Sequence, residues 1–134
     1  MTSIIDIEGI GKDYAKKLGA VGIKTTETLL KKGATPKGRE EIAKGTGLTG
    51  HQILEWVNRA DLFRVKGIGE EYSDLLEAAG VDTVVELSKR DAKNLTTKMA
   101  EVNTKKRLVR RLPAEKEVVK WIAQAKRMPR AVSY

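Results

Sequence analysis

Residues 67–72, Gly-Ile-Gly-Glu-Glu-Tyr, separate two stretches of helical periodicity and decide the fold of this chain. Glycine accepts the left-handed backbone angles of a tight turn and lets another group approach the main chain closely. The isoleucine between the two glycines can insert into the core and lock the turn. We therefore predict a hairpin between a helix over about residues 50–62 and a helix over about residues 70–79.

The hairpin sequence occurs twice, so the chain contains an internal repeat. Residues 4–30 align with residues 62–88 at a shift of 58, and nine of the 27 aligned positions are identical. Most of the other pairs keep their apolar or polar character. We predict a single domain built of two repeats, about residues 4–61 and 62–127.

A later pair of similar segments locates a difference in length between the copies. Ile53–Val57 aligns with Val118–Ile122, now at a shift of 65. The second copy therefore holds about seven extra residues, which we expect within residues 101–114.

The turn and cap residues indicate helices throughout. Thr25 and Thr83 are suited to the N-cap position, because a threonine hydroxyl accepts a hydrogen bond from a first-turn amide. Thr49 with Gln52 resembles a capping box, and Pro113 is expected to start the last helix. The period-two alternation typical of strands is missing, so the predicted fold class is all-α.

Composition excludes several kinds of site. The chain has no cysteine and a single histidine, which excludes disulfides, cysteine-ligated metal sites and His-rich metal sites. No apolar run approaches the ~20 residues that span a bilayer, and the N-terminal residues lack the basic and apolar regions of a signal peptide. We therefore expect a cytoplasmic protein. No phosphate-binding loop, dinucleotide motif or carboxylate pair stands out, so we expect no enzyme and no organic cofactor.

Several residues receive structural interpretations. His51 is expected to be exposed at a helix start, since no nucleophile motif accompanies it. Trp56 and Trp121 lie on the apolar faces of equivalent helices and are expected in the core. Tyr14 and Tyr72 follow the hairpins by three residues and are expected to brace them.

The net charge of +8 is unevenly distributed. Residues 1–87 carry 12 Lys/Arg and 14 Asp/Glu, whereas residues 88–134 carry 14 Lys/Arg and four Asp/Glu. A one-sided positive segment is typical of proteins that bind polyanions, and a solubilising face is the alternative interpretation. The residues predicted to form this basic strip are Lys105, Lys106, Arg107, Arg110 and Arg111, continued on the next helix by Lys116, Lys120 and Arg127. If the strip is helical from its start, Leu108, Val109 and Leu112 face inward.

The Gly-Ile-Gly turns resemble the helix-hairpin-helix motif of DNA-binding and repair proteins. In that motif the turn amides contact phosphates of one strand, often with a bound monovalent cation, and no base is read. The resemblance implies backbone contacts to nucleic acid at Gly9, Ile10, Gly11, Gly67, Ile68 and Gly69. Lys12 is placed to add a charged contact at the first hairpin. Glu70 and Glu71 depart from the motif, because they repel a phosphate at the second hairpin.

Three further segments contribute to a second resemblance, one that extends beyond the hairpins: Ala34-Thr35-Pro36-Lys37-Gly38-Arg39, Leu54-Glu55-Trp56-Val57-Asn58 and Leu108-Val109-Arg110-Arg111. With these segments, nearly all of the chain resembles the helical domain-of-unknown-function 4332 family, which contains such hairpins. The resemblance implies a fold of tandem helix-hairpin-helix repeats and no established activity.

These observations predict a non-enzymatic protein that binds nucleic acid, with duplex DNA as the expected ligand, through sequence-independent contacts to phosphates. The alternative is a protein-interaction or scaffold module with the same fold, which the acidic second hairpin favours. A monovalent cation at a hairpin is the one cofactor considered. We expect no membrane partner, and the sequence leaves DNA against RNA and monomer against dimer undecided.

The last helix raises a question of assembly. The helix that carries Val118, Trp121 and Ile122 has no hairpin after it, while the first hairpin, residues 9–11, has only a short leader before it. An amphipathic helix must bury its apolar face. We therefore expect the last helix to cover the first hairpin and close a pseudo-two-fold domain, either within one chain or by exchange in a dimer.

Overall fold

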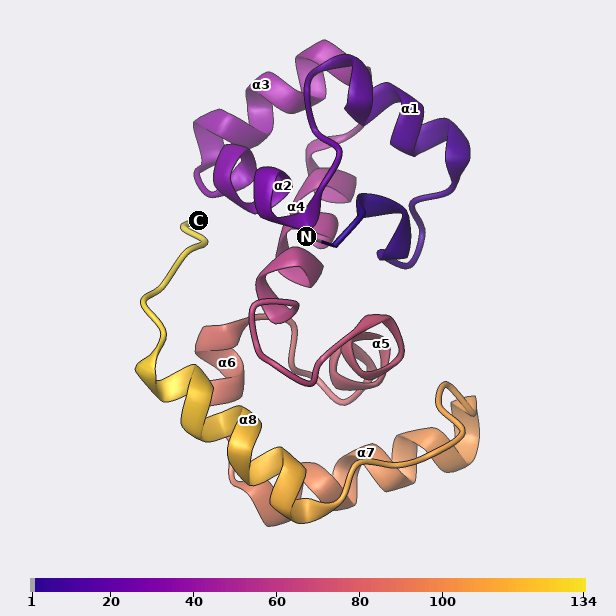
Figure 1. The fold of residues 1–134 in the computed structure, drawn as a ribbon, viewed down its shortest axis with the longest axis vertical. Coiled ribbons are helices and arrows are strands. Elements are labelled where there is room, and N and C mark those ends of the chain that lie inside the picture. The colour runs from indigo at the N-terminus through magenta and orange to yellow at the C-terminus, as the bar shows by residue number, and fades with distance from the viewer. Residues whose placement is uncertain (1) are drawn as a thin grey trace. The chain divides into compact units, whose positions relative to one another are not determined.

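Helices form the regular structure of residues 2–134, the part of the chain described by this computed structural model. The all-α prediction is confirmed, and within that range the β-type pairing is limited to an isolated bridge between Ser3 and Thr25. The elements in chain order are η1 (Ile4–Asp6), α1 (Lys12–Ala20), α2 (Thr26–Gly33), α3 (Pro36–Thr46), α4 (Gly50–Leu62), α5 (Glu70–Ala78), α6 (Val84–Ser88), α7 (Ala92–Lys106) and α8 (Glu115–Arg127) (Figure 1).

The helix starts follow from their capping residues. The hydroxyls of Thr25 and Thr83 each accept a hydrogen bond, at 3.2 Å, from the amide three residues later. Thr49 and Gln52 form the predicted capping box: the Gln52 N–H donates to the Thr49 hydroxyl at 3.1 Å, and the Thr49 N–H donates to Gln52 Oε1 at 3.2 Å. These bonds satisfy first-turn amides that have no partner inside a helix.

The chain divides into two compact units, which are described separately below. Unit 1 consists of Met1–Asp61 and Arg130–Tyr134, and unit 2 consists of Leu62–Pro129. The division between Asp61 and Leu62 falls where the two copies of the sequence repeat meet. The chain therefore leaves unit 1 once and returns to it at its C-terminal end.

Unit 1 is built around α3. Both α1 and α2 pack against this helix. The fully buried apolar side chains of unit 1 include Ile7 before α1, Leu18 of α1, Ile23 after α1, Leu29 of α2, and Ile53 and Val57 of α4. Burial of such aliphatic side chains supplies the main stabilising free energy in a chain with few aromatic residues.

The final residues of the chain dock on unit 1 around Arg39. The buried guanidinium of Arg39 donates to the carbonyl oxygen of Gly33 at 2.8 Å and to that of Ser133 at 2.7 Å. The Ser133 N–H donates to the Ala34 carbonyl at 2.8 Å, and the Tyr134 ring lies 5.9 Å from the Arg39 guanidinium carbon. A buried guanidinium without acceptors is strongly destabilising. Arg39 therefore depends on the Ser133 carbonyl as an acceptor, and this hydrogen bond holds the C-terminal tail against α3.

Unit 2 is completed by α8. This helix packs against α6 and α7, and α5 packs against α7 (Figure 1). A single apolar cluster contains the buried face of α8 and the second hairpin, including Val65, Ile68, Val118, Trp121, Ile122 and Ala125. The apolar stripe of the last helix is thus buried by residues of its own unit.

The first glycine of each hairpin is left-handed and packs against an indole. Gly9 has a φ of 91° and Gly67 a φ of 99°. A methyl group built on Gly9 would lie 3.4 Å from Trp56 Nε1, and one built on Gly67 would lie 2.9 Å from Trp121 Nε1. The left-handed conformation favours glycine at both positions, and at Gly67 the short distance to Trp121 excludes a side chain as well.

The tyrosine after each hairpin contacts the same indole. The ring centroids of Tyr14 and Trp56 are 5.3 Å apart with an angle of 53° between the planes. Those of Tyr72 and Trp121 are also 5.3 Å apart, at 52°. Both tryptophans are buried, so the predictions of core tryptophans and bracing tyrosines are confirmed.

The prediction that the last helix covers the first hairpin is wrong. Each hairpin is covered by the tryptophan-bearing helix that follows it within its own unit. Trp56 of α4 packs against Gly9 of the first hairpin, and Trp121 of α8 packs against Gly67 of the second. The first hairpin therefore needs no helix before it. The prediction of a closed domain formed by that exchange is therefore also wrong.

The two glycines of the second hairpin should respond differently to substitution. Gly67→Ala is expected to lower the free energy of unfolding by about 2–3 kcal/mol, because alanine is strained at this φ and its methyl group meets Trp121. Gly69 has a φ of −113° and no atom within 4 Å of a built methyl group, so Gly69→Ala should change it by less than about 0.5 kcal/mol. Urea denaturation measures both, and equal losses would contradict this division of roles.

Candidate nucleic-acid interface

The first hairpin presents the open N-terminus of α1. Gly11 is the N-cap with extended backbone, and a methyl group built on it meets no atom within 4 Å. Ile10 is buried, as predicted, and its N–H already donates to the Ile7 carbonyl at 3.1 Å. The amides that remain for an anion are therefore those of the first turn of α1, next to the exposed Lys12 side chain.

The second hairpin has the same backbone and a different charge. Gly69 is an extended N-cap with open space beside it, and Ile68 is buried with its N–H donated to the Val65 carbonyl at 3.1 Å. The first turn of α5, however, carries the exposed Glu70 and Glu71. Their negative charge stabilises the helix end and opposes an incoming phosphate at the same amides.

The basic strip is not a continuous helix. α7 ends at Lys106, and α8 begins only at Glu115, so Pro113 precedes the last helix instead of starting it. In the loop between them Val109 is buried and Leu108 is partly buried, as expected. Leu112 is 39% exposed, which contradicts the prediction that it faces inward. That prediction assumed helical spacing, which the loop does not have.

The loop between α7 and α8 is held in one conformation by side-chain hydrogen bonds. Asn103 acts at both ends of its amide: Oδ1 accepts from the Val109 N–H at 3.0 Å, and Nδ2 donates to the Val109 carbonyl at 3.1 Å. The Tyr72 hydroxyl donates to the Arg111 carbonyl at 3.1 Å. The Arg111 guanidinium donates to both carboxylate oxygens of Glu117, at 3.0 and 3.3 Å. Arg111 is thus committed to fixing the loop on α8.

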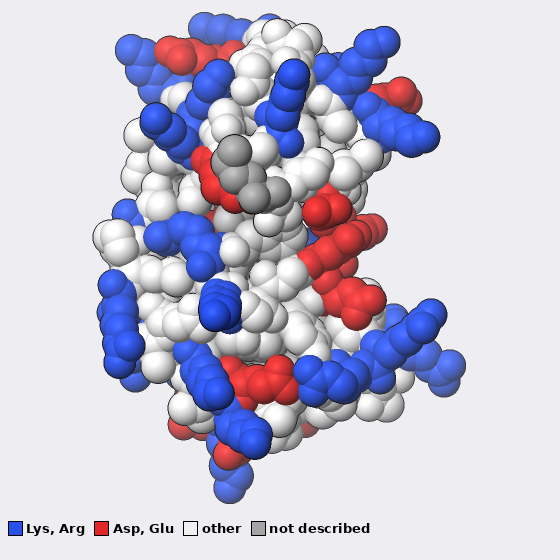
Figure 2. Space-filling model, in the orientation of Figure 1, with Lys and Arg blue, Asp and Glu red and all other residues white. Residues whose placement is uncertain are grey.

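The other cations of the strip point into solvent. Lys105, Lys106, Arg107 and Arg110 are exposed, and within residues 2–134 no side-chain hydrogen bond or ion pair engages them. Lys120 on α8 is exposed in the same way. Figure 2 shows Lys and Arg atoms gathered where the end of α7 and the following loop lie in Figure 1. This arrangement leaves full charges available to a polyanion.

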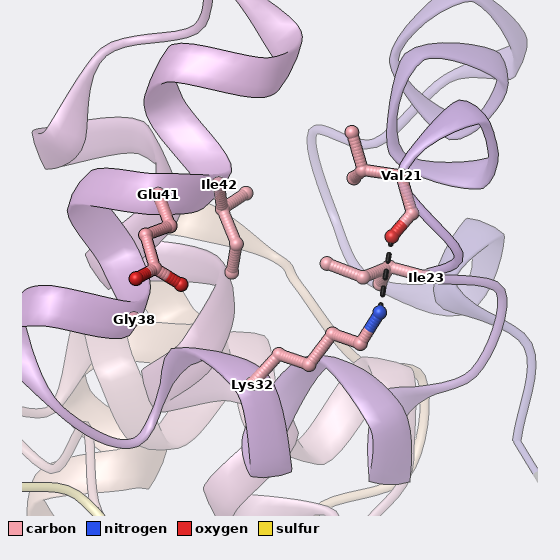
Figure 3. Close-up of a pocket in the computed structure, with 6 residues that line it drawn as sticks. All are labelled: Val21, Ile23, Lys32, Gly38, Glu41 and Ile42. Carbon is pink, nitrogen blue, oxygen red and sulfur yellow. Dashed lines mark hydrogen bonds between the residues drawn. The ribbon is translucent and has the colours of Figure 1, made fainter.

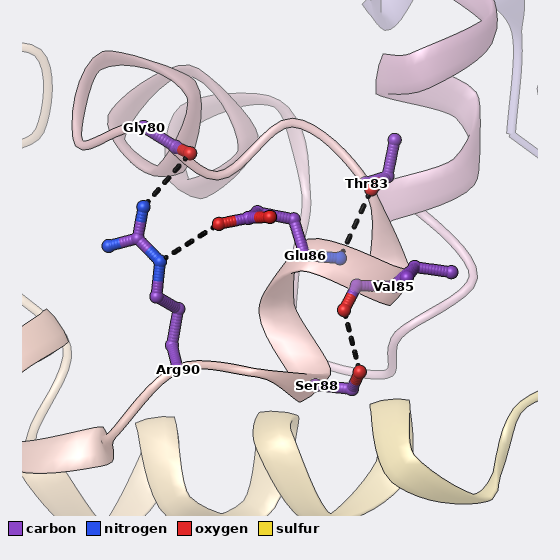
Figure 4. Close-up of polar contacts among 6 residues, drawn as sticks. All are labelled: Gly80, Thr83, Val85, Glu86, Ser88 and Arg90. Carbon is purple, nitrogen blue, oxygen red and sulfur yellow. Dashed lines mark hydrogen bonds and ion pairs between the residues drawn. The ribbon is translucent and has the colours of Figure 1, made fainter. Parts of the chain in front are cut away.

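Two other cations are used inside the fold. Lys32 Nζ donates to the Val21 carbonyl beyond the end of α1 at 3.1 Å (Figure 3). Arg90 donates to the Gly80 carbonyl beyond the end of α5 at 3.1 Å and pairs with Glu86 at 3.1 Å (Figure 4). Both are favourable positions for a cation, at the carbonyl end of a helix. Lys32 and Arg90 are 58 residues apart and so occupy equivalent positions in the two copies of the repeat. A cation at the same position of both copies could have indicated this structural role from the sequence.

A pocket of about 320 Å³ lies in unit 1 (Figure 3). Its lining combines apolar side chains with one ammonium and one carboxylate: Val21, Ile23, Lys32, Gly38, Glu41 and Ile42. None of these residues belongs to the predicted interface. The side chain of His51 is 81% exposed in the first turn of α4, as predicted, and its Nε2 lies 3.1 Å from Glu55 Oε1, a contact that was not predicted.

A family model described as "Domain of unknown function (DUF4332)" matches residues 8–128. The chain belongs to the DUF4332 family. The DUF4332 match covers both hairpins, the basic strip and all helices from α1 to α8. No curated protein and no solved structure matches the chain. None of the helices within residues 2–134 of this DUF4332 chain combines the length and the apolar character that a membrane span requires.

The loop contact of Glu117 should depend on pH. The hydrogen bonds from the Arg111 guanidinium and the Ala114 N–H hold the pKa of Glu117 below its ordinary value. A carboxyl group whose pKa is lower in the folded state stabilises the fold above its unfolded pKa, and this stabilisation is lost as the pH falls through the lowered value. Glu117→Gln should therefore reduce stability at neutral pH.

The measurement is denaturant unfolding of the wild type and Glu117→Gln across the acid range. The difference between their unfolding free energies should be largest at neutral pH and should disappear below the lowered pKa of Glu117. A difference that stays constant into strong acid would mean that the ion pair does not fix the loop.

Proposed function

We propose that this chain is a non-catalytic protein that binds nucleic acid, with duplex DNA as the main ligand, through sequence-independent contacts to the phosphate backbone. The observation that carries the proposal is the group of exposed, unpaired cations at the end of α7 and in the following loop. Each such cation that meets a phosphate releases condensed counterions, which drives binding without reading a base.

The first Gly-Ile-Gly turn adds a second contact, in the manner of a helix-hairpin-helix. Its supporting features are the open N-cap at Gly11, the first-turn amides of α1 and the exposed Lys12. The second turn contributes little to this activity, because Glu70 and Glu71 occupy the corresponding positions.

An alternative function is binding of a protein partner, and the acidic second hairpin is the observation that favours it. Glu70 and Glu71 suit a basic protein surface as well as they oppose a phosphate. Retention of one stoichiometric protein, with no retention of DNA at low salt, would support this function over the first.

Reversal of two loop charges should remove most of the binding. Lys106→Glu combined with Arg110→Glu is expected to weaken binding to duplex DNA about 100-fold near 0.1 M salt and to make the log–log salt slope less steep by about 1.8. Helicity should not change, because both side chains are exposed. Fluorescence anisotropy with a labelled duplex, together with circular dichroism, measures both quantities.

A matched control changes the same amount of charge elsewhere. Lys31→Glu combined with Lys37→Glu alters two exposed cations of unit 1 that lie outside the proposed interface. If both double variants lose affinity equally, binding responds to net charge alone and the assignment to the loop fails.

The first hairpin has its own test. Gly11→Ala places a methyl group in open space, so stability should be kept while close approach of a phosphate is blocked. Lys12→Ala should make the salt slope less steep by about 0.9, the contribution of one phosphate contact on duplex DNA. Two stable variants that bind as the wild type does would show that this hairpin only packs.

A further inference from the structure

The second copy of the repeat contains an addition that the fold of the first copy does not need. In the first copy, α3 has 11 residues and three residues, 47–49, join it to the next helix. In the second copy, α7 has 15 residues and eight residues, 107–114, make the same connection. The second copy has four more helical residues and five more loop residues, and α7 starts two residues earlier in the repeat, which leaves the net seven extra residues that the sequence predicted. We call residues 103–114 the insert.

The insert replaces glycine with arginine at a left-handed position. In the first copy the C-cap of α3 is Gly47, with a φ of 76° and its N–H donated to the Ala43 carbonyl at 2.8 Å. In the second copy the C-cap of α7 is Arg107, with a φ of 50° and its N–H donated to the Asn103 carbonyl at 2.8 Å. Both residues close their helices with the same hydrogen bond and a positive φ, so this helix end needs a left-handed residue but no particular side chain.

Arg107 is costly to the fold at this position. Within residues 2–134 it is the only residue other than glycine with a positive φ. A side chain in the left-handed region is destabilising relative to glycine, because its Cβ approaches the neighbouring carbonyl. Strained positions of this kind are typical of functional sites. Since the Arg107 side chain is exposed and makes no hydrogen bond or ion pair within residues 2–134, no contact of its own offsets that cost.

The insert is also ordered before any ligand arrives. The two hydrogen bonds between Asn103 and Val109, the burial of Val109 and the Arg111–Glu117 ion pair fix its backbone. A loop that is already ordered loses less conformational entropy on binding than a flexible one. The exposed cations of the insert are therefore presented on a fixed support.

Resting on the function proposed above, we propose that the insert is a preorganised phosphate-binding loop and that Arg107 makes a direct contact with the nucleic-acid backbone. The left-handed turn at position 107 directs the guanidinium away from the α7–α8 core, where it donates to phosphate oxygens in the bidentate manner open to arginine. The strain at this residue is kept because the side chain binds.

The test uses Arg107→Gly in the full chain. Glycine relieves the strain, so the melting temperature should rise by about 2–4 °C. The same variant should bind a labelled DNA duplex about tenfold more weakly near 0.1 M salt, with a salt slope less steep by about 0.9. Arg107→Lys keeps the charge and should recover part of the affinity without the gain in stability.

Lys37→Ala is the matched control, because it removes from α3 of the first copy one exposed cation that, like Arg107, makes no ion pair within residues 2–134, and it should leave binding unchanged. Wild-type affinity in Arg107→Gly would overturn the proposal and leave the general function intact. Loss of affinity without a rise in melting temperature would overturn the claim that strain is kept for binding. A wild-type chain that does not retain the duplex at low salt would overturn the proposed function and this inference together.

Discussion

The structure depends on the contact between a left-handed glycine and an indole. At Gly67 the missing side chain leaves room for Trp121 Nε1, which would stand only 2.9 Å from a methyl group at that position. The indole in turn supports Tyr72, and the same three-residue arrangement occurs in unit 1. Because this contact joins a hairpin to the helix that closes its unit, it determines which helices can form one core. A core with few aromatic residues can therefore be organised by two tryptophans, because each packs against the glycine of one hairpin.

Local features of the fold could be predicted from the sequence, because their causes are local. Threonine caps, the Thr49–Gln52 box and the apolar faces of α4 and α8 all depend on residues within one or two turns of each other. The partner of α8 could not be predicted in this way, because two hairpins with nearly equal sequences compete for it. The backbone conformation of residues 107–114 could not be predicted from the sequence either. It is fixed by hydrogen bonds of Asn103, Tyr72 and Glu117, and the partners in these bonds are up to 39 positions apart.

The basic strip shows what a count of charges leaves out. Arg111 belongs to the same run as Arg110, yet its guanidinium is occupied by Glu117 while Arg110 is exposed. Lys32 and Arg90 likewise serve helix ends. Positive charge accumulates in one part of the sequence, and the hydrogen bonds divide these side chains into cations that hold the fold and cations available to a ligand. The second group is concentrated in a segment that the first copy lacks.

The docked C-terminal tail has a consequence for the unfolding of unit 2. Residues 62–129 are anchored in unit 1 at both ends, by continuity of the chain at Asp61 and by the contacts of Arg39 with Ser133 and Tyr134. While those contacts last, an unfolded unit 2 is a closed loop whose ends cannot separate, and its conformational entropy is smaller than that of a free chain. The few residues around Arg39 therefore act as a non-covalent counterpart of a disulfide, raising the stability of a unit to which they do not belong.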